Sequence, residues 1–363
     1  MDRRTSLSLE VHPDIRRAST LPAVVYSDPA VFEAQKERVF ARSWHFAGDL
    51  DRLRAPGTVM PFTLGEGVLD EPLVLTRDRD DRLHCLSNVC THRAARVVEN
   101  EAMCSVLRCR YHGRRFRLDG RLASMPEFEE VEDFPSERDN LPRVPFGAFG
   151  KMLFAALDPA VPFGEWIAPV AERIAWLPLD ELQFDATRSK DYLVRANWAL
   201  YCDNYLEGFH IPYVHPGLAE NLDYGSYRTE LFEHSSLQVG VAADGEAAFD
   251  LPAESPDAGE RIAAYYFWMF PNLMINVYPW GISLNVVKPL AVDRTRVSFL
   301  SWVLDPSRLE DGAGAALDRV EREDEVIVES VHQGTRSRLY DRGRYSPARE
   351  QGVHHFHRLL ADC

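Results

Sequence analysis

Two short segments in the first half of the chain each combine one cysteine with one histidine. Cys90 precedes His92 by two residues, and Cys109 precedes His112 by three. Two thiolates and two imidazoles suit an iron–sulfur cluster of mixed ligation, in which sulfur holds one iron and nitrogen holds the other. Exchanging charged thiolates for neutral imidazoles raises the reduction potential of such a cluster. The two segments therefore indicate a [2Fe–2S] centre that carries electrons.

A structural zinc site is the alternative for the same four residues, because zinc also binds sets of two cysteines and two histidines. Zinc fingers usually place both cysteines in one knuckle and both histidines in the other. Here each segment contributes one residue of each kind. This arrangement favours the cluster, and a protein that held only zinc would be colourless.

A second candidate metal site lies in the segment 203–215, whose sequence is DNYLEGFHIPYVH. His210 and His215 are five residues apart, so an unbroken helix would turn them to different faces. Pro212 lacks a backbone donor and should break the helix between them, which can return His215 toward His210. Glu207 precedes His210 by three residues and shares its helix face. The spacing alone is weak evidence, because backbone carbonyls could satisfy both histidines.

A third ligand, Asp324, is expected on the final helix, residues 315–336. The apolar face of that helix is formed by Leu317, Val320, Ile327, Val328 and Val331. Asp324 falls on this face, whereas its acidic neighbours are expected to point into solvent: Glu321, Glu323 and Glu325. An unpaired buried carboxylate is costly, so Asp324 should have a cation partner. Two histidines and one carboxylate form the facial triad that binds Fe(II) and leaves positions open for O2. A buried arginine or backbone donors are the alternative partners of Asp324.

Together these motifs resemble the catalytic alpha subunit of the Rieske non-haem iron oxygenases over nearly the whole chain. The resemblance implies a [2Fe–2S] cluster and a mononuclear Fe(II), with O2 as co-substrate. It assigns the cluster to Cys90, His92, Cys109 and His112, and the mononuclear iron to His210, His215 and Asp324. It also implies that Glu207 bridges the two kinds of centre between neighbouring subunits and carries electrons. That arrangement requires a homotrimer or a multiple of one.

Glu207 also indicates a branch of this family. Ring-hydroxylating dioxygenases commonly have aspartate at this position, whereas a DNYLEGFH-like segment is more similar to choline and carnitine monooxygenases and related demethylases. Two residues depart from the family pattern. Arg114 stands where tryptophan often follows the second cluster motif, and we expect it to reshape the surface where a redox partner docks. His332 stands where relatives often have glutamine, and we expect it behind the iron ligands or in packing.

The expected function is that of a terminal oxygenase that hydroxylates or N-demethylates a small organic substrate, such as a quaternary ammonium or amine. Oxidation of an aromatic or natural-product scaffold is the alternative reaction, and a Rieske electron-transfer protein without oxygenase activity is the alternative class. Gly312-Ala313-Gly314 lacks the third glycine of a dinucleotide motif, so electrons from NAD(P)H should arrive only through a separate reductase or ferredoxin. Three aromatic residues are candidates for the substrate pocket, although core packing is the simpler interpretation of each: Tyr205, Phe209 and Trp268.

The order of elements predicts an α+β protein of two domains. Short strands separated by turns indicate a small all-β Rieske domain over residues 43–158. Residues 159–363 mix long strands with helices, and the resemblance implies a catalytic domain with a helix-grip (START-like) antiparallel sheet. Residues 1–42 are expected to form a helical segment that packs on the catalytic domain.

The composition excludes several classes of partner. The chain has 56 acidic and 41 basic residues and a net charge of −15, which argues against nucleic acid or an anionic membrane as partner. No apolar run approaches the length of about 20 residues that a transmembrane helix needs. The N-terminus lacks the apolar core of a secretory signal, and the six cysteines show no disulfide-framework spacing. A cytoplasmic enzyme is therefore expected.

Overall fold

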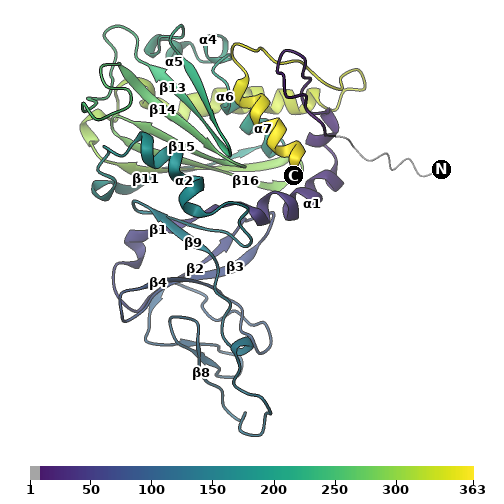
Figure 1. The fold of residues 1–363 in the computed structure, drawn as a ribbon, viewed down its shortest axis with the longest axis vertical. Helices are drawn as coiled ribbons and strands as arrows, with labels where there is room; N and C mark the ends of the chain where they lie inside the picture. The colour runs from purple at the N-terminus through teal and green to yellow at the C-terminus, as the bar shows by residue number, and fades with distance from the viewer. Residues whose placement is uncertain (1–8) are drawn as a thin grey trace, which may run out of the picture. The chain divides into compact units, whose positions relative to one another are not determined.

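The computed structural model describes residues 9–363, which divide into two compact units (Figure 1). The smaller unit is Ala41–Phe163, and the larger unit combines the described residues up to Phe40 with Gly164–Cys363. The expected boundaries, after residues 42 and 158, lie a few residues away. Antiparallel strands build the smaller unit, and helices join an antiparallel sheet in the larger one. The expected α+β class is therefore confirmed.

Three antiparallel sheets form the smaller unit. The first has the order β1-β10-β9, with bounds His45–Asp49, Met152–Ala155 and Phe146–Phe149. The second has the order β4-β3-β2-β5, with bounds Leu83–Ser87, Glu71–Arg77, Thr58–Leu64 and Ala102–Met103. The third has the order β6-β7-β8, with bounds Leu107–Arg108, Arg115–Phe116 and Leu122–Ser124. Short 3-10 helices accompany them: η2 (Phe40–Arg42), η3 (Leu50–Leu53) and η4 (Glu137–Asp139).

Both cysteines of the paired motifs belong to the hydrophobic core of this unit. Cys90 and Cys109 pack in one cluster with Val74 and Leu86, which come from the neighbouring strands β3 and β4. Between β7 and β8 the chain turns at Gly120, whose φ of +88° favours glycine. The sheets therefore provide a rigid base for the two loops that carry the Cys and His residues.

A seven-stranded antiparallel sheet forms the centre of the larger unit (Figure 1). Its order is β11-β17-β16-β15-β14-β13-β12. In chain order the strands are β11 (Gln183–Val194), β12 (Arg228–Phe232), β13 (Ser235–Val241), β14 (Ile262–Met269), β15 (Leu273–Tyr278), β16 (Gly281–Ala291) and β17 (Arg294–Val303). The tryptophans Trp268, Trp280 and Trp302 are fully buried in this unit.

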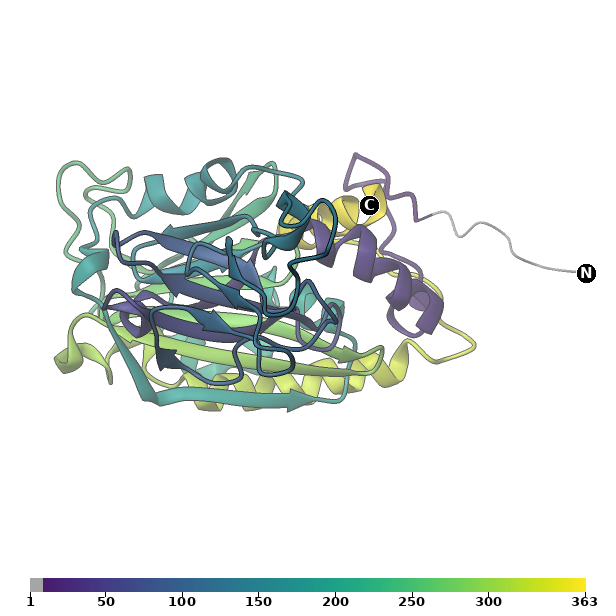
Figure 2. The ribbon, with the colours of Figure 1, turned by 90° about the horizontal axis from the view of Figure 1, so that it is seen from below.

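Helices flank this sheet. The α-helices are α1 (Pro29–Arg38), α2 (Phe163–Arg173), α3 (Trp198–Tyr205), α4 (Ile211–Val214), α5 (Pro216–Asn221), α6 (Leu317–Gly334) and α7 (Gln351–Asp362). The remaining 3-10 helices are η1 (Ala23–Tyr26), η5 (Leu179–Glu181), η6 (Pro306–Arg308) and η7 (Gly312–Gly314). Helix α6 lies along β11 (Figure 2), and α3 packs against α6, α7 and β16. Within the described residues, no helix is both long and apolar enough to span a membrane.

The described N-terminal residues, 9–40, belong to the larger unit. Gln35 of α1 accepts a hydrogen bond from the indole of Trp198 at 3.1 Å. The Tyr26 hydroxyl donates to Asp203 at 2.9 Å, and Asp203 also contacts the imidazole of His357 at 2.8 Å. His357 is buried on α7. These contacts join segments from both ends of the chain to helix α3.

Helix α6 buries a different stripe of residues from the apolar face that the sequence suggested. Val328 is buried as expected, but Ile327 and Val331 are 36% and 47% exposed. Glu321 and His332 are buried in their place, because positions 321, 328 and 332 follow the helical period on the side that faces the unit. The expectation that Glu321 points into solvent is therefore wrong.

Candidate active site

The two loops of the smaller unit that carry Cys and His have the same backbone hydrogen bonds. In the first loop the N–H of Cys90 donates to Ala95, and the N–H of Ala94 donates back to Cys90. In the second loop the N–H of Cys109 donates to the carbonyl of Arg114, and that of Gly113 donates to Cys109. The fifth residue of each loop is left-handed, with φ of +54° at Ala94 and +76° at Gly113. The matched turns present equivalent side chains from both loops.

The donors of these loops suit an iron–sulfur cluster. Both cysteines are buried, and the rings of His92 and His112 lie 4.7 Å apart at a more exposed position. Burial raises the pKa of the Cys90 thiol, and the nearby Cys109 adds to this rise. Two thiolates together in the core need a cationic partner. The arrangement can therefore hold a cluster whose cysteine end is buried and whose histidine end faces outward.

Arg114 does not lie on the surface, which corrects the expectation that it reshapes a docking face. Its side chain is 2% exposed, and Nη2 donates to Asp139 Oδ1 at 2.7 Å. The guanidinium lies over the rings of Phe116 and Phe134, at 5.6 Å from each ring centroid. The backbone carbonyl of Asp139 also accepts from the hydroxyl of Thr91. Arg114 and Thr91 thus tie both loops to Asp139.

The second histidine pair lies in the larger unit, after helix α3. Helix α3 ends at Tyr205, and Pro212 lies in the first turn of the short helix α4, so the expected break at Pro212 between the two histidines is wrong. The chain therefore changes direction before His210 and not after it. His215 follows α4 with φ of −119° and ψ of 70°. This non-helical residue turns its imidazole toward His210, with ring centroids 5.2 Å apart.

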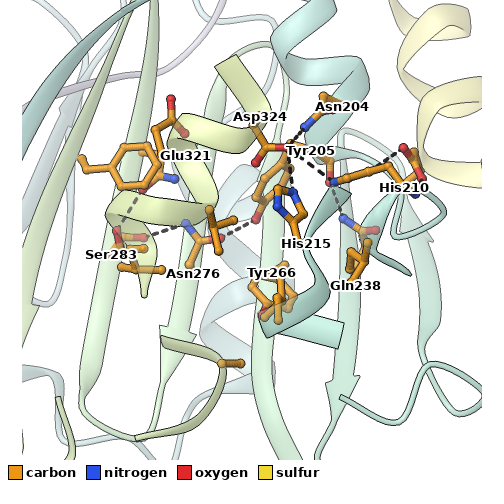
Figure 3. Close-up of a pocket in the computed structure, with 18 of the residues that line it drawn as sticks. Asn204, Tyr205, His210, His215, Gln238, Tyr266, Asn276, Ser283, Glu321 and Asp324 are labelled. Atoms are coloured by element: carbon orange, nitrogen blue, oxygen red, sulfur yellow. Dashed lines mark hydrogen bonds and ion pairs between the residues drawn. The ribbon is translucent and has the colours of Figure 1, made fainter. Parts of the chain in front are cut away.

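Asp324 of α6 completes this site (Figure 3). Its Oδ1 lies 2.9 Å from Nε2 of His215 and 3.6 Å from Nε2 of His210. The ligand atoms of all three residues lie within 4.8 Å of one another. Asn204, which the sequence did not single out, donates to the same Oδ1 at 2.6 Å. The three side chains converge as a two-histidine, one-carboxylate metal site requires.

A carboxylate orients each of these histidines from behind. Glu207 Oε1 lies 2.7 Å from Nδ1 of His210, and Glu323 Oε2 lies 2.7 Å from Nδ1 of His215. A carboxylate only accepts hydrogen bonds, so in the neutral imidazole that binds metal each Nδ1 carries the hydrogen and each Nε2 presents a lone pair. In this tautomer Nε2 of His215 and Oδ1 of Asp324 face each other as two acceptors, which a metal cation between them would satisfy. The expectation that Glu323 is solvated is wrong.

Glu207 is fixed by the turn that follows α3. Its Oε2 accepts from the backbone N–H groups of Phe209 and His210. Only glycine fits at two positions next to this turn. A Cβ on Gly208 would lie 2.7 Å from the ring of Tyr227, and a Cβ on Gly352 would lie 2.3 Å from the carbonyl oxygen of Leu206. Only 13% of the Glu207 side chain is exposed. Its carboxylate is thus held against His210.

A cavity of about 750 Å³, its open mouth included, lies beside the three converging residues. It is lined by side chains of α3, the turn after it, the sheet and the first half of α6 (Figure 3). Its aromatic lining consists of Tyr201, Tyr205, Tyr227, Tyr266, Tyr278 and Phe299. Of the three candidate pocket residues, only Tyr205 lies here. The structure places Trp268 in the core and leaves Phe209 41% exposed beside Tyr213. His332 also lies away from this cavity, next to Arg336.

The electrostatic character of the cavity is acidic. Among residues 9–363, no lysine or arginine lines it. Gln238 and Glu321 line it, and the Oε1 atom of each is buried without a hydrogen-bond partner within residues 9–363. Burial lowers the pKa of His215, but the carboxylates of Asp324 and Glu323 outweigh this effect and raise its pKa overall. Both the metal site and the cavity are therefore arranged to attract positive charge.

Comparison with known proteins decides the family. The model of the Rieske [2Fe–2S] domain matches residues 43–135, and that of the ring hydroxylating alpha subunit (catalytic domain) matches residues 179–363. The chain belongs to the Rieske ring-hydroxylating oxygenases. It is a terminal oxygenase component that uses a [2Fe–2S] cluster, mononuclear iron and O2, and it carries the expected Rieske and catalytic domains.

The relatives of this oxygenase act on quaternary ammonium compounds. It is 32% identical to the choline monooxygenase of Arabidopsis thaliana, over 98% of this chain and 86% of the relative. It is 30% identical to the carnitine monooxygenase oxygenase subunit of Escherichia coli, over 95% and 94% of the two chains. A solved quaternary ammonium Rieske monooxygenase superposes with a TM-score of 0.79 at 26% identity, covering 97% of this chain and 99% of the other. Naphthalene 1,2-dioxygenase from Rhodococcus superposes at 0.73 with 18% identity, covering 94% and 93%, which shows the shared fold alone.

Proposed function

We propose that this oxygenase hydroxylates a carbon bonded to the quaternary nitrogen of a small trimethylammonium compound that carries no carboxylate. The observation that carries the proposal is the cavity, which has aromatic walls and unpartnered acceptors. Aromatic faces attract ammonium cations. A carboxylate on the substrate would find no lysine or arginine among the described lining residues. The chemistry of the pocket thus favours a choline-like alcohol over a carnitine-like acid.

We assign the two metal centres to two sets of residues, one in each unit. Cys90, Cys109, His92 and His112 would hold the cluster, and His210, His215 and Asp324 would hold the iron. When bound, the cluster supplies electrons one at a time and the iron activates O2 next to the substrate. Glu207 and Glu323 hold the histidines in the tautomer that binds metal. The tyrosine walls limit the access of water to the reacting carbon.

Electron supply is proposed to run between subunits. Glu207 would hydrogen bond both to His210 and to a cluster histidine of the adjacent subunit, which requires a homotrimer or a multiple of one. Phe209 and Tyr213 support an interface at this point, because they are 41% and 79% exposed next to His210. A solved relative is described as showing inter-subunit electron transfer. A separate reductase or ferredoxin would reduce the cluster, in a reducing, cytoplasmic compartment that keeps the cysteines free.

A coupled assay tests the substrate proposal. The oxygenase, with its cluster and iron loaded and a surrogate reductase present, is given ¹⁸O2 and choline, carnitine or naphthalene in separate reactions. We expect one ¹⁸O atom in the choline product, slower reaction of carnitine and none of naphthalene. Product from naphthalene, with no product from either ammonium compound, would overturn the proposal in favour of aromatic oxidation.

A metal analysis of two variants tests the assignment of ligands. His210→Ala and Asp324→Ala should lose the mononuclear iron and product formation but retain the visible spectrum of the Rieske cluster, because the two ligand sets lie in different units. Loss of the cluster from either folded variant would show that the ligands are assigned to the wrong centres.

A further inference from the structure

Glu321 is a buried acid that the ligand assignments leave without a role. Its residue is 2% exposed, and it lines the cavity from helix α6. Its Oε2 accepts a hydrogen bond from the hydroxyl of Tyr201, while its Oε1 has no hydrogen-bond partner within residues 9–363. A buried carboxylate oxygen without a partner is costly. The site therefore lacks a positively charged or hydrogen-donating group.

The position of Glu321 relates this missing group to the iron site. Glu321 and Asp324 both belong to α6 and line the cavity. Residues three apart on a helix are neighbours on one face and are separated by about 4.5 Å along the axis. A cation beside Glu321 would therefore lie about one helical turn from the iron ligand Asp324.

We propose that the Glu321 carboxylate binds the cationic nitrogen group of the substrate and makes this oxygenase specific for cations. The inference rests on the proposed function and deepens it, because it names the residue that recognises the charge. A quaternary ammonium group donates no N–H, so the interaction is one of charge with the methyl groups around the nitrogen. By holding that group one turn from Asp324, Glu321 would place a carbon next to the nitrogen near the iron.

Electrostatics favour this role over a purely structural one. Burial raises the pKa of the Glu321 carboxyl; the Tyr201 hydroxyl opposes this rise, and Asp324 and Glu325 add to it. A cation in the cavity would offset the same cost. The neighbouring arginine, Arg322, is directed elsewhere, since it pairs with Glu325 at 2.9 Å. Arg322 still lowers the pKa of Glu321 through its charge, but no lysine or arginine among residues 9–363 lines the cavity, so on the cavity side the substrate is the source of positive charge.

Binding measurements with a matched pair of ligands test the proposal without turnover. Choline is compared with 3,3-dimethylbutan-1-ol, which has the same shape but carbon in place of the charged nitrogen. Calorimetry is done anaerobically on the holoenzyme. Each variant must first show the wild-type Rieske spectrum and iron content, which establishes that it is folded and loaded.

The variants separate charge from size and packing. Glu321→Gln keeps an oxygen that can accept from Tyr201 but removes the charge, so we expect the preference for choline over its neutral analogue to fall at least tenfold. Glu321→Asp keeps the charge and should retain most of the preference. Glu329→Gln is the matched control, because Glu329 lies on the same helix, pairs with Arg195 and does not line the cavity. It should bind both ligands as the wild type does.

The outcomes distinguish the inference from the proposed function. If choline binds and is oxidised but Glu321→Gln discriminates as well as wild type, the inference is overturned and the proposed function stands. If wild type binds only protonated amines, in a manner that needs Glu321, the inference stands and the quaternary substrate is wrong. If wild type binds no cation in preference to its neutral analogue, both are overturned.

Discussion

The Nδ1 atom of His215 lies 2.7 Å from Oε2 of Glu323. This contact selects the tautomer in which Nε2 of His215 presents its lone pair toward Asp324 Oδ1, 2.9 Å away. Glu207 and His210 repeat the same relationship on the other side of the site. Both histidines that we propose as iron ligands are thus oriented by carboxylates that lie outside the proposed ligand set.

We predict that Glu323→Ala weakens iron binding by about 10- to 100-fold, because partners of this kind fix the orientation and basicity of a metal-binding histidine. The measurement is the affinity of the anaerobic apo-site for Fe(II), with the Rieske spectrum recorded in parallel. Glu329→Ala on the same helix is the control and should bind iron normally. Glu323 also forms an ion pair with Arg319 at 2.9 Å. Equal affinities for Fe(II) in the two variants would show that Glu323 serves only this ion pair.

The second prediction concerns the loops of the cluster. Ala94 and Gly113 occupy equivalent left-handed positions, with φ of +54° and +76°. An L-residue in this conformation costs about 1–2 kcal/mol. Gly113→Ala should therefore lower the stability of the cluster-bearing loop by about this amount. No steric clash adds to this cost, because the new Cβ would lie at an ordinary 3.5 Å from Pro126. Ala94→Gly should be neutral or slightly stabilising.

Thermal loss of the visible cluster absorbance measures both loop variants. Strong destabilisation by Ala94→Gly, together with tolerance of Gly113→Ala, would contradict the equivalence of the two loops.

The third prediction concerns the buried arginine beside the cluster loops. Arg114→Met removes the ion pair between Arg114 and the partly exposed Asp139. We expect the smaller unit to lose about 2–3 kcal/mol of stability, somewhat less than the cost of breaking a fully buried pair. The control is Arg110→Met. Arg110 is 78% exposed and pairs with Glu99 at 3.2 Å, a contact of the kind that contributes about 1 kcal/mol or less.

Release of the cluster on heating distinguishes Arg114 from Arg110. The Arg114 variant should lose its cluster at a clearly lower temperature, whereas the mononuclear site should keep its iron. Indistinguishable curves for the two variants would show that the Arg114–Asp139 pair does not hold the loops.

The residues that we propose as metal ligands could be selected from the sequence because their types are few and their spacing is restrictive. Cys90, His92, Cys109 and His112 form a motif by themselves. Asp324 was selected from an apolar helix face that the structure bears out only in part, because Val328 is buried but Ile327 and Val331 are exposed. Glu321 and Glu323 were missed for the opposite reason. Glutamates on a helix usually face solvent, and their inward direction depends on Tyr201 and His215, which lie more than 100 residues away.

The fold shows the same limit. Strand β15, Leu273–Tyr278, consists of six consecutive buried residues, and a short apolar run of this kind is a clear strand pattern in a sequence. Strand β13 alternates the apolar Leu237 and Val239 with the polar Ser236 and Gln238, and all four are buried. The sequence does not reveal that the polar face is buried as well. Gln238 lines the cavity and donates to the backbone of Tyr205. A buried polar side chain that lines the cavity, such as Gln238, therefore gives a weaker sequence signal than the apolar run of β15.

The central claim is that electrons reach the iron through Glu207. Glu207→Gln keeps the size of the side chain but removes its charge, so both metals should remain bound. The most direct measurement is a single-turnover experiment, in which the reduced, substrate-loaded oxygenase is mixed with O2 and reoxidation of the cluster is followed by its absorbance. We expect reoxidation to slow at least tenfold, a barrier increase of about 1.4 kcal/mol or more. A rate within about twofold of wild type, with both metals present, would contradict the claim and leave Glu207 a structural residue.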